Sequence, residues 1–356
     1  MGRERNFEIM RTMAMFFIVV YHCLTHGVGY DYGFNIDHPT SLFNFILSDL
    51  LLVFSSISVN LYVMVSGYFL ADIRFKIGRI VRTWLNACFY SFVITIVFMA
   101  LSLTPWNLIT LGKSVLPLAT DAYWFVTQYI GLLILSPFLV IIIRHLSFRQ
   151  YIALLIVGAF LCLSIIPEFP FGKRFYVAHG NSVWCFAYLF MFAGFIRHYS
   201  GDFSKRKLLF FIVLVVMLTA VSEMYMGCKG DIAHLFWFDY NGLPFILSIV
   251  MFIFIRQVKI PSSMLWNIMV KVAPYTFGIY LIHDHLMVRD LLWKIVSLPS
   301  YGQRWDYSLY VLTLSLLVFV ICALVDAVRK RIFSLFDIDE HIAKLDECSV
   351  FSKLFT

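Results

Sequence analysis

The sequence predicts an all-α protein, a polytopic bundle of about ten transmembrane helices with both termini on the cytoplasmic side. Of its 356 residues, 61% are hydrophobic and only 14% are charged, and the mean hydropathy is +0.84. Soluble domains are about half apolar and about a quarter charged. The apolar residues form long runs, and short basic clusters separate these runs. The chain therefore requires lipid as its solvent.

The apolar runs have the length of membrane spans, for which a helix needs about 20 mostly apolar residues. The segments that meet or approach this length are 12–30, 50–70, 80–103, 122–143, 150–166, 183–198, 207–226, 240–257, 272–291 and 307–328. No small-residue cleavage site follows the first run, so we interpret it as a retained helix. We expect one membrane-embedded domain over 1–356, with a core of about 5–328 and a short cytoplasmic tail over 329–356.

The positions of the basic residues predict the orientation. With the N-terminus inside, 21 of the 28 Lys and Arg residues fall in loops on the inner side and seven on the outer side. This bias alternates from loop to loop, as the positive-inside rule requires, and it needs an even number of spans. The net charge of +7 is therefore explained by topology, and we expect no nucleic-acid partner.

The first span carries two ionisable side chains, Arg11 and His22. Eleven helical steps of 100° amount to almost three turns, so both residues lie on one face, about 16 Å apart along the axis. Ionisable residues inside a span are costly and mark functional sites. Arg11 is then placed to hold an anion at the cytoplasmic boundary, and His22 to accept a proton near the bilayer centre. From these residues alone, a snorkelling Arg beside a His bonded to a neighbouring helix is an equal alternative.

The second inner loop is strongly basic, with Arg74, Lys76, Arg79 and Arg82 within nine residues. Arg79 and Arg82 are three residues apart, which places them on one face at the start of the third helix. Guanidinium groups bind phosphate with two parallel hydrogen bonds. The cluster is a candidate phosphate-binding site, although positive-inside topology alone also explains it.

The ninth span ends in His283, Asp284 and His285. Residues two apart on a helix point about 160° away from each other, so the two histidines do not readily share one metal ion. We therefore expect no metal and a single inward-facing His283 with a polar partner. Tyr123 and Trp124 begin the fourth span at the outer face, where aromatic rings either stack on sugars or form an interfacial belt.

These motifs occur together in an order that resembles one known family. In chain order they are Arg11-x10-His22, the stretch VNLYVMVSGYFL at 59–70, the basic run at 74–84, the stretch YWFVTQYIGLLILSP at 123–137, and YTFGIYLIH at 275–283. The chain resembles the acyltransferase-3 family, the bacterial membrane enzymes that O-acetylate cell-surface polysaccharides. The resemblance extends from about residue 5 to 328.

The resemblance implies ten core helices in the bacterial plasma (inner) membrane, acetyl-CoA as a cytoplasmic acyl donor, and a hydroxyl of a cell-surface or lipid-linked polysaccharide as acceptor. It implies that Arg11 and His22 are essential. The family's Arg-x-Arg feature after the second helix corresponds to Arg74-Phe-Lys76, where the second Arg is replaced by Lys, so Arg79 or Arg82 is expected to compensate. Tyr123, Trp124 and His283 are expected to support the substrate.

The mechanism expected from the resemblance is general-base catalysis by His22, because a sugar hydroxyl is a poor nucleophile until a base removes its proton. Burial keeps the imidazole neutral and free to act. The pantetheine arm of CoA would carry the thioester inward while the phosphates remain on the basic residues. A covalent acetyl-His intermediate is the alternative mechanism. The alternative function is a transporter or flippase for a lipid-linked sugar, because such pathways are also lined by His and Arg.

Overall fold

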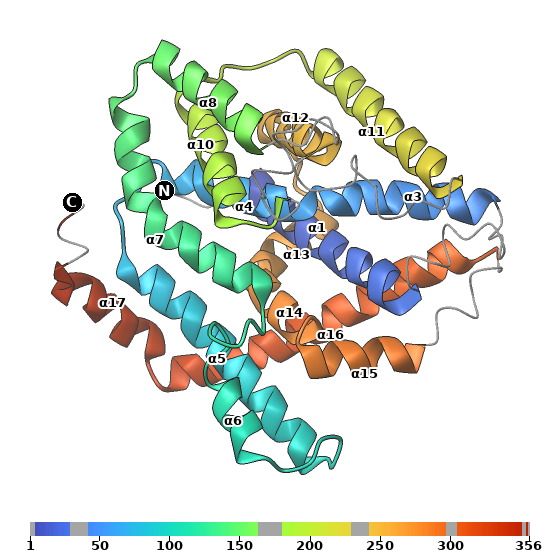
Figure 1. Ribbon diagram of the computed structural model, residues 1–356, viewed down its shortest axis with the longest axis vertical. Coiled ribbons are helices and arrows are strands. Elements are labelled where there is room, and N and C mark those ends of the chain that lie inside the picture. The colour runs from blue at the N-terminus through green and yellow to red at the C-terminus, as the bar shows by residue number, and fades with distance from the viewer. Residues whose placement is uncertain are drawn as a thin grey trace.

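The computed structural model describes residues 4–28, 42–162, 180–228, 242–296, 305–350 and 354, and within these ranges the chain is helical and has no strand. Figure 1 shows the arrangement of the helices. In chain order they are α1 (Arg5–His22), η1 (Cys23–Val28), α3 (Leu42–Ser56), α4 (Ser58–Leu70), α5 (Ile77–Ala100), α6 (Leu108–Ser114), α7 (Trp124–His145), α8 (Phe148–Cys162), α10 (Val183–Tyr199), α11 (Lys205–Cys228), α12 (Leu243–Gln257), α13 (Met264–Val272), η4 (Ala273–Tyr275), α14 (Thr276–His283), α15 (Leu286–Val296), α16 (Tyr307–Leu335) and α17 (Ile338–Cys348).

The all-α prediction is confirmed, and each of the ten predicted segments overlaps a helix. Residues 29–30, 163–166 and 240–241 of these segments, and 351–353 and 355–356 of the predicted tail, lie outside the described residues. Within the described ranges, six helices are long and apolar enough to cross a membrane on their own. They span Arg5–Gly27, Ile46–Leu70, Ile77–Ala100, Trp124–His145, Met264–His283 and Tyr307–Leu335. Phe148–Cys162 and Leu243–Gln257 are shorter apolar helices.

The ninth segment differs from the expectation of one continuous helix over 272–291. Pro274 lies in the 3₁₀ turn η4, and α14 ends at His283, before the separate helix α15 begins. Proline has no backbone N–H to continue an α-helical ladder, which explains the first interruption. The membrane-length helix here is instead Met264–His283, and His283 lies at its end.

The core is centred on α4, which packs between α1 on one side and α10 on the other. Nearly every residue of α4 is buried, and the helix reads as hydrophobic all round, as expected for a central helix of a bundle. Gly67 permits the approach of α10, because a Cβ at this position would lie 2.8 Å from the Cα of Phe190. The α10 helix packs in turn against α7 and α8.

Several predicted inner loops meet at one end of the bundle, which we call the basic end: the start of α1, the end of α4, the start of α5, the end of α10, and α17. Arg197, at the end of α10, pairs with Asp72 after α4 (2.6 Å) and with Glu4 before α1 (3.9 Å). Arg82 of α5 pairs with Asp339 of α17 at 2.9 Å. These ion pairs join loops that the charge count had assigned to one side.

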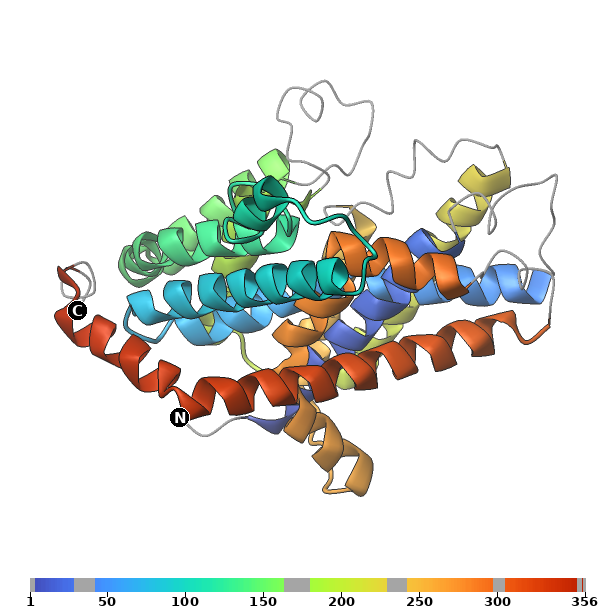
Figure 2. The same ribbon diagram turned by 90° about the horizontal axis from the view of Figure 1, so that it is seen from below.

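The last predicted span continues beyond its expected end, because α16 runs to Leu335 rather than 328. Figure 2 shows α16 along one face of the bundle, leading into α17. A buried polar cluster lies where the predicted span was expected to end. The Arg329 guanidinium bonds Asp326 (2.7 Å) and Asn86 (2.9 Å), and the Tyr90 hydroxyl donates to Asp326 at 2.7 Å. The pairing allows a charged residue to remain inside the bundle.

Candidate active site

The end of α1 changes its helical winding where the first candidate residue lies. His22 is the last residue of α1, and the π-helical turn η1 follows over Cys23–Val28. Short π-helical turns occur frequently at functional sites. The turn brings the rings of His22 and His26 together, with centroids 5.3 Å apart. His22 is buried, with 8% of its surface exposed.

His22 is joined to the end of α14 by a direct contact between two imidazoles. Its Nδ1 lies 2.9 Å from Nε2 of His283. The other ring nitrogen of His283, Nδ1, lies 2.6 Å from the carbonyl oxygen of Ile279, one turn earlier in α14. Residue 283 is completely buried. The side chain of His283 thus faces inward, as expected from the sequence, and its polar partner is His22.

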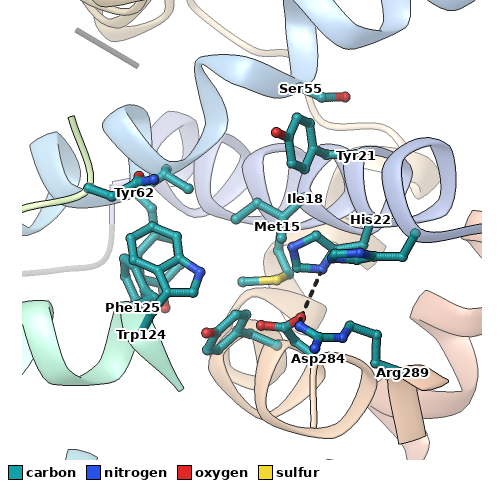
Figure 3. Close-up of a pocket in the computed structure, with 14 residues that line it drawn as sticks. Met15, Ile18, Tyr21, His22, Ser55, Tyr62, Trp124, Phe125, Asp284 and Arg289 are labelled. Carbon is teal, nitrogen blue, oxygen red and sulfur yellow. Dashed lines mark ion pairs between the residues drawn. The ribbon is translucent and has the colours of Figure 1, made fainter. Parts of the chain in front are cut away.

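A charged pair lies beside this contact. Oδ1 of Asp284 is 3.6 Å from Nδ1 of His22 and 3.7 Å from Nη1 of Arg289 in α15. Figure 3 shows these three side chains converging from α1, the end of α14 and α15. Because α14 ends at His283, the chain turns there, and Arg289 is brought back toward the end of α1. Asp284 thus lies between the imidazole of His22 and the guanidinium of Arg289.

His22 and His26 open onto a cavity of about 270 Å³, which we call the histidine cavity. Its aromatic wall includes Trp124 and Phe125 from the start of α7 and Tyr62 from α4, and these rings lie across from His22 in Figure 3. The full lining is Met15, Ile18, Tyr21, His22, His26, Ser55, Val59, Tyr62, Trp124, Phe125, Asn181, Tyr280, Asp284 and Arg289. The cavity combines apolar rings with a few convergent polar groups, which is typical of small-molecule sites.

Tyr123 occupies a different position from its neighbour Trp124. It is buried behind the cavity wall, and its hydroxyl donates a 2.9 Å hydrogen bond to the carbonyl of Leu281 in α14. Its ring also contacts His285, with centroids 6.0 Å apart. Tyr123 therefore holds α7 against the helix that carries His283, while Trp124 faces the cavity.

Arg11 lies three turns before His22 and does not line the histidine cavity. Its Nη1 is 3.4 Å from Oε1 of Glu8, and its side chain is 30% exposed. Arg11 also interacts electrostatically with Tyr62, a residue of the cavity wall. It is thus placed between the basic end and the histidine cavity, and it carries a charge that one acidic neighbour partly compensates.

A second cavity of about 220 Å³ lies at the basic end, and we call it the arginine cavity. Arg74, Arg79 and Arg144 line it, together with Leu70, Ile73, Phe75, Ser136, Pro137, Val140, Ile141 and Leu354. Arg79 donates a 3.1 Å hydrogen bond to the main-chain carbonyl of Arg74, which holds the Arg79 side chain against the segment that carries Arg74. From the sequence, Arg144 is only one of the basic residues that predict the orientation of the chain. Its position in the last turn of α7, on the same predicted side of the membrane as Arg74, could have indicated that it joins this cluster.

Lys76 and Arg82 do not line the arginine cavity. Lys76 occupies the N-cap position of α5, and Arg82 pairs with Asp339. Of the four predicted phosphate-binding residues, the structure therefore brings together Arg74 and Arg79 and adds Arg144 from another helix.

The grouping of His22, His26 and Asp284 has the composition of a metal site, since one ligand atom from each lies within 4.8 Å of the others. This grouping differs from the His283 and His285 pair considered from the sequence. A divalent ion would have to share Asp284 with the Arg289 guanidinium, 3.7 Å away. Two cations on one carboxylate repel each other, so the charge arrangement favours the ion pair over a metal.

Membrane-length helices, a buried His22 on the wall of one cavity and a separate arginine-lined cavity define a multi-pass membrane protein with two internal cavities. The chain belongs to the acyltransferase-3 family. The sequence profile of this family, described as an acyltransferase domain, matches residues 4–327. The protein is therefore a membrane acyltransferase, and the resemblance seen in its motifs is confirmed. No curated protein and no solved structure shows a significant match.

Proposed function

We propose that this acyltransferase moves an acetyl group from acetyl-CoA, bound at the cytoplasmic face of a bacterial plasma membrane, to a hydroxyl of a cell-surface or lipid-linked polysaccharide. The observation that carries the proposal is the position of His22. It is a buried imidazole on the wall of a cavity with aromatic and polar lining, in a bundle that also holds an arginine-lined cavity at its basic end.

The proposed chemistry is direct transfer with His22 as general base. As the hydroxyl oxygen attacks the thioester carbonyl, its proton passes to the imidazole. The new C–O bond forms, the C–S bond breaks, and the CoA thiolate leaves. The imidazolium then returns the proton to the thiolate, so His22 ends the cycle neutral. Asp284, 3.6 Å from His22, and Arg289, which pairs with Asp284, supply fixed charges near the base.

The donor is proposed to bind with its phosphates in the arginine cavity. Arg74, Arg79 and Arg144 offer guanidinium groups from two directions, which suits a polyanion. The α4 helix connects the two cavities, since Tyr62 lines one and Leu70 lines the other. Eight residues of helix correspond to about 12 Å. The pantetheine arm of the donor would extend along this part of α4 to carry the thioester to His22.

The acceptor is proposed to occupy the aromatic side of the histidine cavity. Trp124 and Tyr62 present ring faces on which the apolar face of a sugar stacks, and Asn181 adds an amide for hydroxyl recognition. The same lining would hold the hydroxyl next to His22. We propose Trp124 as a substrate-contacting residue and Tyr123 as its support through the bond to α14.

The basic end is proposed to face the cytoplasm, in a ten-span topology with both termini inside. The inner loops hold 21 of the 28 Lys and Arg residues, and several of these loops gather at this end. We expect a reporter fused after Thr356 to read as cytoplasmic and one inserted at Pro117, between α6 and α7, to read as extracytoplasmic. The opposite pair of readings would reverse the orientation and remove the proposed site of donor binding.

Loss of Arg79 or Arg144 is expected to weaken acetyl-CoA binding. Each side chain contributes a charge-assisted contact worth about 1.5–3 kcal/mol, so Arg79→Ala and Arg144→Ala should each raise the Kd about 10- to 150-fold. Binding of acetyl-CoA to detergent-purified protein by calorimetry measures this. Arg82→Ala is the matched control, because Arg82 forms an ion pair with Asp339 and does not line the cavity. Equal Kd values for the wild type and both cavity variants would show that acetyl-CoA does not bind in the arginine cavity.

The proposed function is tested directly in proteoliposomes. Acetyl-CoA is supplied at the basic end and a defined oligosaccharide is added, and free CoA thiol and the mass of the glycan are followed together. We expect CoA release that depends on the glycan, with an acetyl mass increment on the glycan. Movement of a lipid-linked sugar across the bilayer without CoA release would identify a flippase instead.

A further inference from the structure

The hydrogen bonds around His283 determine where its proton lies. Its Nδ1 is 2.6 Å from the main-chain carbonyl oxygen of Ile279. A carbonyl oxygen accepts hydrogen bonds and cannot donate one, so Nδ1 of His283 must carry a hydrogen. His283 is completely buried and its only imidazole neighbour at hydrogen-bond distance among the described residues is His22, so the neutral form is favoured, because a positive charge there would lack solvation. The neighbouring carboxylate, Asp284, already pairs with Arg289. In neutral His283, Nε2 therefore holds a lone pair.

This arrangement also fixes the proton on His22. Nδ1 of His22 lies 2.9 Å from Nε2 of His283, and a hydrogen bond at that distance needs one donor. Since Nε2 of His283 is the acceptor, Nδ1 of His22 is the donor. The remaining nitrogen of His22, Nε2, is left with its lone pair. Among the hydrogen bonds of the described residues, none involves this nitrogen.

We propose that His283 is a positioning residue that fixes His22 as the Nδ1–H tautomer and so presents the basic Nε2 to the acceptor hydroxyl. The inference rests on the proposed function, in which His22 removes the hydroxyl proton. A base oriented by a third group is a recurring device of nucleophilic catalysis. Here the orienting group is a neutral imidazole, itself anchored on the main chain of α14.

The proton movements follow from this assignment. The hydroxyl proton passes to Nε2 of His22, and the oxygen forms its bond to the acyl carbon as the C–S bond breaks. The imidazolium that results keeps its Nδ1–H bond to His283, and Oδ1 of Asp284, 3.6 Å away, stabilises the positive charge. The proton on Nε2 then passes to the CoA thiolate. His283 neither gains nor loses a proton in the cycle.

Two substitutions of His283 separate positioning from packing. The amide of His283→Asn corresponds to the Nδ1 side of the ring, so it keeps the bond to the Ile279 carbonyl and leaves His22 without an acceptor. The longer His283→Gln reaches the Nε2 position, and its amide oxygen accepts from His22. We expect kcat to fall about 10- to 100-fold in His283→Asn, with the KM for acetyl-CoA unchanged, and to recover at least about fivefold in His283→Gln. Equal losses in both variants would reduce His283 to a packing role.

A direct measurement of the tautomer is independent of activity. In protein labelled with ¹⁵N-histidine and reconstituted in liposomes, solid-state NMR distinguishes protonated from unprotonated ring nitrogens, and His22→Gln identifies the signals. We expect His22 to be protonated at Nδ1 in the wild type and to become a mixture of tautomers in His283→Asn. A wild-type His22 protonated at Nε2, or one unaffected by His283→Asn, overturns the inference. If the tautomer responds as expected but no acyl transfer occurs with any glycan, the positioning holds and the proposed function fails.

Discussion

Replacement of His22 by alanine is expected to lower acyl transfer by about 10²- to 10⁴-fold, which is the usual contribution of a general base. The protein should still insert and accumulate, since alanine is apolar and favours a helix. Glycan-dependent CoA release in proteoliposomes measures the loss, and the amount of folded protein is followed in parallel. Residual activity is expected for direct transfer. A covalent mechanism predicts almost none, together with an acetyl group on His22 of the wild type trapped during turnover.

The control for His22 must come from outside the cavity. From the sequence, His26 would serve, because it is one turn further along. In the structure its ring is 5.3 Å from that of His22, and it lines the same cavity. His341, exposed in α17, is the better control, and His341→Ala should leave transfer unchanged. Near-normal acetylation in His22→Ala combined with an inactive His26→Ala would assign the base to His26.

Much of the fold was predictable because its determinants are local. The length of each apolar run and the positions of Lys and Arg depend only on neighbouring residues, and they located most helix ends to within a few positions, although α1 begins at Arg5 rather than 12 and α16 ends at Leu335 rather than 328. Arg11 and His22 could be related for the same reason, since both lie on one regular helix of known pitch. The fourth predicted span, 122–143, corresponds to α7 at Trp124–His145. The predicted and observed ends differ by two residues, which is the usual uncertainty in the position of a helix end.

The arrangement of the site was not predictable, because it depends on residues that are distant in sequence. His22 and His283 meet only through the packing of α1 against α14, and no periodicity links them. Arg144 joins Arg74 and Arg79 because α7 ends where α5 begins. The break after His283 was also missed, since apolar residues lie on both sides of the short stretch His283-Asp284-His285 and no glycine or proline marks the turn. Patterns of hydropathy predict which segments are apolar, but they do not predict which residue a buried polar group will contact.

The position that carries His283 depends on the close contact between α14 and α16. A Cβ at residue 278 would overlap Asp326, with the Cβ of Asp326 only 2.7 Å away. Asp326 is fully buried and is held by the Tyr90 hydroxyl and the Arg329 guanidinium, both at 2.7 Å. It therefore cannot move aside without breaking a buried ion pair, a change that typically costs about 3–5 kcal/mol. Glycine at 278 is required by this approach, since any side chain would separate the two helices.

Gly278→Ala is accordingly expected to lower the thermal midpoint of the purified protein and the amount that accumulates in the membrane. It should also lower acyl transfer in the fraction that folds, because a displaced α14 carries His283 away from His22 and removes its hydrogen-bond acceptor. Thermal unfolding in detergent, followed by size-exclusion chromatography, measures the first effect. Gly112→Ala is the matched control, because a Cβ at residue 112 of α6 would meet no atom within 4 Å. If Gly278→Ala is as stable as Gly112→Ala, the distance between α14 and α16 must be larger than the close approach of residue 278 to Asp326 indicates. The position of His283 next to His22 would then depend on the packing of α14 against α1 and α7 alone.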